Sequence, residues 1–288
     1  MATGVARSFV IGSFTARTVL AWIRRDPRAG ELARTNFHGR TVTLAGGPAL
    51  AAGATIGAAF GAPSPAAAAA VVTAGVASGA VGFYDDVVGN RPEQKAAKGF
   101  AGHLGALREG RVTSGLVKVA GVGAAGLAAA ALLAGDPRVR GHQARQRGGA
   151  VRGTVDVLLG AGVIAGTANL LNLLDLRPGR ALKAGVLLGT PLAVGRRGGV
   201  AAGAVGASVG LLPEDLGEDI MLGDAGANAL GALLGVALAA RTGPAGRAVA
   251  LAVLAGLTAA SEKVSFTKVI QDTPWLRRAD ELGRRPNL

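Results

Sequence analysis

Apolar residues run through the chain in nine stretches that short charged segments separate. The stretches are 8–22, 41–62, 64–84, 112–135, 153–174, 181–195, 198–213, 226–240 and 244–260. A membrane-spanning helix needs about 20 mainly apolar residues, with a range of about 17 to 25. The pattern therefore predicts an all-α integral membrane protein, a polytopic bundle of about nine spanning helices (range about 8 to 10) over residues 1–260. Residues 261–288 form a polar tail.

The composition agrees with a membrane bundle. Charged residues make up 17% of the chain, against about 25% in an average soluble domain. The chain has 47 Gly but only ten aromatic residues, and small side chains are what closely packed membrane helices use. High hydrophobicity excludes a disordered chain. The absence of Cys excludes thiolate sites, and three widely spaced His argue against a His-based metal cluster.

The placement of charge predicts an orientation. With the N-terminus outside, the segments on the cytoplasmic side carry 19 Lys and Arg and the opposite side carries ten, as the positive-inside rule requires. Of the 18 acidic residues, 16 fall on that same side. We expect a multi-pass plasma-membrane protein whose net charge of +13 serves phosphate and anionic lipid rather than nucleic acid.

Three predicted helix ends bring carboxylates and carboxamides to this cytoplasmic face. The residues are Asp85 and Asp86 in the first segment, Asn169, Asn172 and Asp175 in the second, and Asp224 and Asn228 in the third. Hard oxygen ligands suit Mg²⁺ completed by substrate phosphates, and nearby Lys and Arg suit the phosphates themselves. The alternative is that each segment carries solvated charges that anchor a helix end. Three segments on one face favour the phosphate and metal site.

The same segments resemble a known family. The strings YDD, NLLNLLD and GDAGANALG are similar to the aspartate pair, the N-x-x-N-L-x-D-G motif and the G-D-x-G-S-x-x-L-G motif of the polyprenyl-phosphate sugar-1-phosphate transferases, the MraY and WecA superfamily. The similarity in organisation covers residues 36–285, and only the three motifs are specific. It implies about ten membrane helices and Mg²⁺-dependent transfer of a sugar phosphate, N-acetylhexosamine phosphate first among them, from a UDP-sugar to polyprenyl phosphate in cell-wall biogenesis.

The resemblance also assigns roles. Asp85, Asp86 and Asp175 resemble catalytic residues, and Asp224 with Asp86 resembles the metal site. Substrate contacts are expected from Lys95, Lys98, Asn169, Asn172, Asn228 and Lys263, of which Lys95 and Lys98 align loosely. A homodimer is left open.

The chain departs from the family at four places. Leu176 and Pro178 stand where the family has Gly and a second Asp, and Ala227 replaces the motif Ser. The tail has no His, so Lys263, Lys268 or Arg277 would have to contact phosphate in its place. The tenth helix has no counterpart. Two alternatives to an active transferase follow: a non-catalytic or altered-substrate member that binds lipid phosphate or acts as a scaffold, and a cation transporter. The latter would need carboxylates within the apolar stretches, which hold almost none.

The tail itself predicts a short amphipathic helix. Thr273 is a candidate N-cap, Pro274 suits the first helical position, and Gly283 follows the last turn. Trp275 and Leu282 lie on its apolar face and Asp280 on its charged face. Such a helix either lies on the membrane surface or packs on the bundle as a solvated helix.

Overall fold

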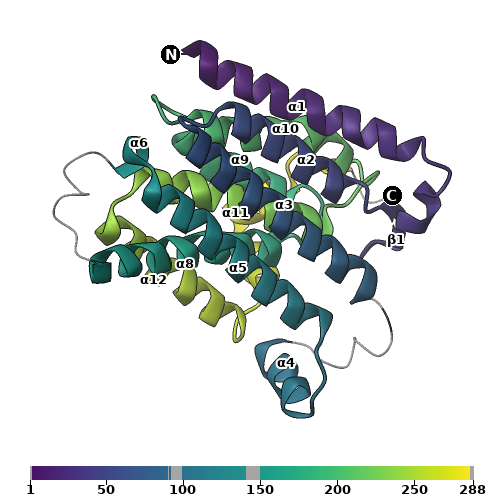
Figure 1. The fold of residues 1–288 in the computed structure, drawn as a ribbon. Helices are drawn as coiled ribbons and strands as arrows, with labels where there is room; N and C mark the ends of the chain where they lie inside the picture. Colours follow the sequence, from purple (N-terminus) through teal and green to yellow (C-terminus); the bar gives the residue numbers. More distant parts are fainter. Residues whose placement is uncertain (1, 90, 92–98, 141–149, 286–288) are drawn as a thin grey trace.

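The computed structural model describes residues 2–89, 91, 99–140 and 150–285 as a helical bundle (Figure 1). Its long helices are α1 (Ala2–Arg24), α2 (Gly46–Phe60), α3 (Pro65–Val88), α5 (Ser114–Gly135), α8 (Ala150–Leu174), α9 (Arg180–Leu192), α10 (Gly199–Leu216), α11 (Gly223–Arg241) and α12 (Pro244–Ser261). Its short helices are α4 (Gly99–Arg108), α6 (Pro137–Arg140), α13 (Phe266–Asp272) and α14 (Pro274–Glu281), with a 3-10 turn, η1 (Ala29–Leu32). Each of the nine apolar stretches lies largely in one long helix.

Five helices, α3, α5, α8, α11 and α12, are long and apolar enough to cross a membrane. The helix α2 is apolar but has only 15 residues. The helix α9 has 13 residues and contains Pro191. The expected all-α bundle is therefore confirmed and five of its helices suit a membrane, whereas the expected number of about nine spans is not confirmed.

The helix α11 forms the centre of the bundle and packs between α3 and α8 (Figure 1). Its Leu230, Leu233 and Leu234 are almost fully buried. Glycines on α11 let the neighbouring backbone come close, since a Cβ atom on Gly235 would lie 2.6 Å from the Cα atom of Ile164. The small residues of the sequence thus act as contact points between helices, as membrane bundles require.

Glycines also allow close backbone contact where three helices cross. Gly12 of α1, Gly57 of α2 and Gly203 of α10 meet there, and a Cβ atom on Gly57 would lie 2.7 Å from the Cα atom of Gly12 and 2.9 Å from that of Gly203. Any side chain at this crossing would force the helices apart.

A β-hairpin precedes α2 and corrects the expected start of the second apolar stretch. Strands β1 (Ala33–Thr35) and β2 (Thr41–Thr43) pair antiparallel, and α2 begins only at Gly46. The Asn36 side chain accepts the backbone N–H groups of His38 and Arg40, each at 2.9 Å, and Gly39 takes a positive φ of 78°. The β-branched residues of 41–43 favour a strand, so hydropathy alone placed the helix boundary too early.

A buried ion pair joins α8 and α12 towards the end of the bundle that is opposite to the acidic segments. A guanidinium nitrogen of Arg247 lies 2.5 Å from a carboxylate oxygen of Asp156, and the same guanidinium donates to the Ala239 carbonyl at 2.6 and 3.0 Å. Both charged side chains are therefore satisfied within the bundle.

Candidate functional site

The three acidic segments meet at one end of the bundle. Asp85 and Asp86 lie in the last turn of α3, Asn172 lies in the last turn of α8, and Asp224 lies in the first turn of α11. The Asn172 side-chain amide donates a hydrogen bond to the Asp224 carboxylate. The expected convergence of the three segments is therefore seen in the structure.

A lysine that the sequence analysis did not select occupies the middle of this cluster. The ammonium nitrogen of Lys118, from the second turn of α5, lies 2.5 Å from a carboxylate oxygen of Asp224 and 2.7 Å from one of Asp85. All three side chains are at least three-quarters buried. The cluster therefore holds one internal cation between two carboxylates, an arrangement in which each charge compensates the burial of the other.

Asp86 has a different task from its neighbour. Its two carboxylate oxygens accept the backbone N–H groups of Asp224 and Ala225, each at 2.9 Å. These N–H groups belong to the first turn of α11, where backbone donors have no partner within the helix. Asp86 thus caps α11 and fixes the position of Asp224, which agrees with the alternative that some acidic residues anchor helix ends.

Asp175 follows directly on the end of α8 and is half-buried. Its carboxyl accepts the backbone N–H of Gly223, next to Asp224. Burial, together with the negative charges of Asp215, Asp224 and Asp86, raises the pKa of the Asp175 carboxyl well above its usual range.

The residues that were predicted to bind substrate do not all lie at the acidic cluster. Asn169 donates to the Thr258 hydroxyl at 3.0 Å, and with Asn172 and Asn228 it lines a cavity beside Lys118. Lys263 is exposed and follows Glu262, which lines the same cavity. Lys95 and Lys98 lie outside the described residues.

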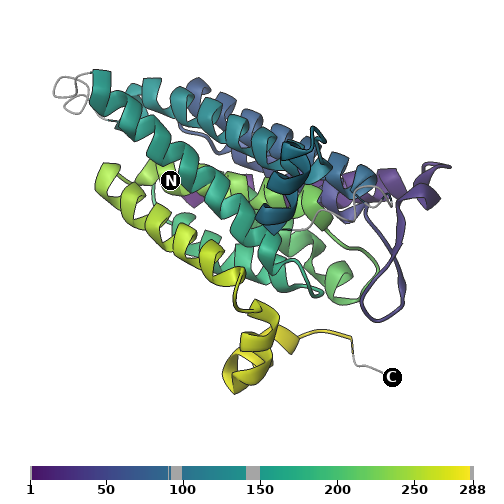
Figure 2. The same cartoon turned by 90° about the horizontal axis from the view of Figure 1, so that it is seen from below.

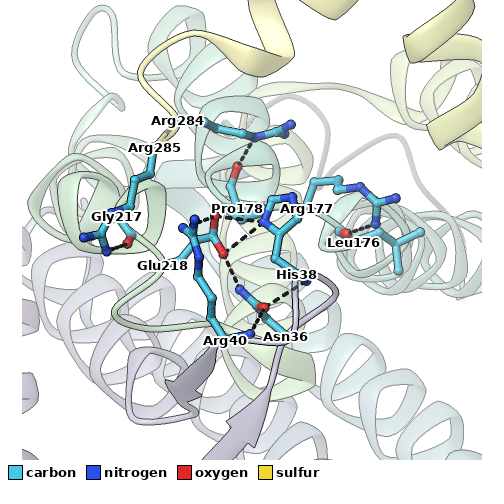
Figure 3. A network of polar contacts seen from close by, with 10 residues as sticks. All are labelled: Asn36, His38, Arg40, Leu176, Arg177, Pro178, Gly217, Glu218, Arg284 and Arg285. Atoms are coloured by element: carbon cyan, nitrogen blue, oxygen red, sulfur yellow. Dashed lines mark hydrogen bonds and ion pairs between the residues drawn. The ribbon is translucent and has the colours of Figure 1, made fainter. Parts of the chain in front are cut away.

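A second polar network has Glu218 at its centre (Figure 3). Glu218, whose side chain is 2% exposed, accepts hydrogen bonds from Asn36 at 2.5 Å and Arg40 at 3.1 Å, and its carboxylate contacts the His38 ring at 2.9 Å. Burial alone would raise the pKa of the Glu218 carboxyl, but these three partners outweigh it and lower that pKa. The hairpin is thereby fastened to the segment that leads into α11.

A cavity of about 230 Å³ lies at this network, and Asp175, Phe37 and Arg177 are among its lining residues. The Arg177 guanidinium stacks 4.0 Å from the centre of the Phe37 ring. The cavity thus offers an aromatic face, a guanidinium and carboxyl groups next to the acidic cluster.

The tail projects from the bundle after α12 (Figure 2) and contacts the segment between α8 and α9. Asp280 of α14 receives two hydrogen bonds from Arg180, at 2.8 and 2.9 Å, and an ion pair from Arg284 at 2.6 Å. Arg284 also donates to the Pro178 carbonyl at 2.8 Å. The tail helix was predicted correctly, but it contacts the bundle through its charged face, while Trp275 and Leu282 are exposed.

Sequence reasoning missed several residues of the site. Lys118 could have been found from the sequence. A single Lys inside an otherwise apolar stretch has an unfavourable free energy of insertion into a membrane, so it needs a partner of opposite charge. The sequence does not single out Glu218, His38 and Asp280, because their partners lie far away in sequence.

Comparisons with known proteins assign no family to the chain. No protein-family model matches it, and no curated protein matches it either.

Proposed function

We propose that the protein is a membrane sugar-1-phosphate transferase that moves a sugar phosphate from a UDP-sugar to polyprenyl phosphate, with its active site on the cytoplasmic face of the plasma membrane. The observation that carries the proposal is the meeting of Asp85, Asp224 and Lys118 at one end of an apolar bundle. The three motifs that resemble the family all lie within this cluster or against it.

The donor set fits Mg²⁺. No three His, Asp or Glu side chains are arranged as a metal cage in the part of the chain that the structure describes. Mg²⁺ does not need such a cage, because it is typically bound through one or two carboxylates together with substrate phosphates. Asp224 and Asp86 offer hard oxygens, and the Lys118 ammonium beside Asp224 supports the proposal because it is a cation held at this position. These two aspartates would hold the ion, which would neutralise charge on the transferring diphosphate.

The chain's own residues would position the two substrates and neutralise their charge. An oxygen of the lipid phosphate attacks the β-phosphorus of the UDP-sugar, a new P–O bond forms, and the bond to UMP breaks. Catalysis of such a step is mostly positioning and charge neutralisation. Lys118 neutralises phosphate charge, and Asp85 keeps the ammonium in register. A phosphate monoester with a second pKa near about 6 is already ionised, so no strong general base is required.

The cavity at Phe37 and Arg177 suits the nucleotide half of the donor. A guanidinium and an aromatic ring together offer a stacking surface and a phosphate contact. Asp175 lies between this cavity and the Asp224 cluster, where a diphosphate would connect the two.

The test is release of UMP by the purified full chain with Mg²⁺, polyprenyl phosphate and a panel of UDP-sugars. We expect one donor to be turned over by the wild type and none by Asp224→Asn. Release of UMP at the wild-type rate by Asp224→Asn would contradict the proposal, as would no turnover by the wild type with any donor.

A second candidate is a non-catalytic member of the same fold that binds lipid phosphate. The Lys118 ammonium favours it, because an internal cation stabilises the carboxylates without any metal. Binding of polyprenyl phosphate by the wild type, together with no turnover of any nucleotide sugar, would select this function.

A further inference from the structure

A cavity of about 370 Å³ opens beside Lys118, between α5, α8, α11 and α12. Its volume is that of a small-molecule site. Val122 and Ala165 are among its apolar lining residues, and its polar lining is formed by Lys118, Asn169, Asn172, Asn228, Thr258 and Glu262. A cavity that combines an ammonium and three amides with apolar walls, set among helices long and apolar enough to cross a membrane, suits a lipid whose anionic head faces the ammonium.

One polar group in this cavity has no partner. Asn228 is 3% exposed, and its side-chain amide nitrogen donates to no acceptor among the described residues. The neighbouring amides differ, because Asn169 is bonded to Thr258 and Asn172 to Asp224. An unpaired buried donor lowers the stability of the fold and calls for an explanation.

The position of Asn228 indicates what it would bind. It lies one turn of α11 beyond Asp224, on the same face of the helix. Lys118 is the one basic residue among the described residues that line the cavity, and its charge is already shared by two carboxylates. The Asn228 amide donates to neither of those carboxylates, so its N–H is available to an acceptor that enters the cavity beside Lys118.

We propose that the Asn228 amide nitrogen donates a hydrogen bond to a phosphate oxygen of the lipid acceptor and so positions that phosphate beside Lys118. The inference rests on the proposed function, because it assigns the cavity to the acceptor lipid. Asn228 is then kept for binding at the expense of stability.

The experiment compares the wild type with Asn228→Leu in detergent. Leu is close to Asn in size and removes the unpaired donor. We expect the affinity for farnesyl phosphate or undecaprenyl phosphate, measured by native mass spectrometry, to fall about tenfold or more. The melting temperature without lipid should rise. A residue with a merely structural role would not move the two readouts in opposite directions.

Three arms identify the source of the effect. Binding of farnesol, which lacks the phosphate, should be equally weak in both proteins, and inorganic phosphate should not replace the lipid. The matched control is Thr55→Val, since the Thr55 hydroxyl is buried and unpaired among the described residues, and Thr55 is not on the cavity lining. It should raise the melting temperature and leave lipid binding unchanged.

The outcomes separate the two ideas. If the wild type binds no prenyl phosphate, the proposed function fails and this inference fails with it. If the wild type binds and Asn228→Leu binds equally well, only the inference is overturned. Should Asn228→Leu not fold, Asn228→Ala, which only removes atoms, answers the same question.

Discussion

The ammonium of Lys118 lies 2.5 Å from a carboxylate oxygen of Asp224, although the two residues are 106 positions apart in the chain. The contact brings the start of α5 to the start of α11, and Asp85 of α3 completes it. The two ion pairs of Lys118 therefore join three helices at the acidic end of the bundle and place an ammonium between its carboxylates.

Lys118→Met should increase the affinity for divalent cations. In the wild type the Lys118 ammonium and Mg²⁺ compete for the Asp224 carboxylate. A unit charge a few ångströms away is worth about 4 kcal/mol at an effective dielectric constant near 20, so we expect Mg²⁺ to bind the variant at least about tenfold more tightly. The Mg²⁺-dependent rise in melting temperature measures this affinity. Lys183→Met, which removes the same charge away from the cluster, is the control, and an equal Mg²⁺ response in wild type and Lys118→Met would contradict the prediction.

Asp86→Asn and Asp224→Asn should differ in stability although both abolish sugar-phosphate transfer. An amide at position 86 retains one acceptor oxygen for two backbone N–H groups, so the capped start of α11 loses about 1 kcal/mol. Asp224→Asn leaves the capping contacts in place but removes the carboxylate charge that faces Lys118, so it should lose more stability than Asp86→Asn. Unfolding in detergent, followed by circular dichroism, ranks both variants against the wild type, and an Asp86→Asn variant as stable as the wild type would show that Asp86 does not act as a cap.

Acid should release the tail. Burial alone would raise the pKa of the Asp280 carboxyl, but Arg180 and Arg284 outweigh burial and hold that pKa below its usual value. The contact therefore contributes fully above the unfolded pKa of about 3.9 and is lost as the pH falls through the lower pKa of the folded state. Fluorescence anisotropy of Trp275 in a Trp22→Phe background should drop below about pH 4. Asp280→Asn should show the low anisotropy already at pH 7, and an unchanged signal in that variant would refute the role of Asp280.

Glu218→Ala should loosen the hairpin. A buried carboxylate with three polar partners is removed, at a cost of about 1 to 3 kcal/mol. The Met221 amide, which donates to the Thr43 carbonyl at 2.9 Å, should exchange its hydrogen faster. Glu109→Gln, at an exposed ion pair with Arg111, should leave this exchange unchanged. Slow exchange in Glu218→Ala would mean that the strand contacts alone hold the hairpin.

The sequence predicted the helices well because each apolar stretch must bury or cover its backbone as a helix in a membrane. It also placed Asp85, Asn172 and Asp224 at one end, since alternating helices bring every second loop to the same side. It could not show that Asp86 caps α11, because a cap formed between distant segments has no local pattern. The same holds for Glu218, whose partners in the hairpin are about 180 positions away.

The ion pair between Asp156 and Arg247 has a consequence for biosynthesis. Asp156 enters the membrane with α8, but its partner on α12 is made 91 residues later. At about 5 to 20 residues per second, this is a delay of roughly 5 to 20 seconds during which Arg247 cannot compensate the carboxylate. During this interval α8 carries a carboxylate that lacks its partner on α12, so the two helices can reach their final packing only after α12 has been made.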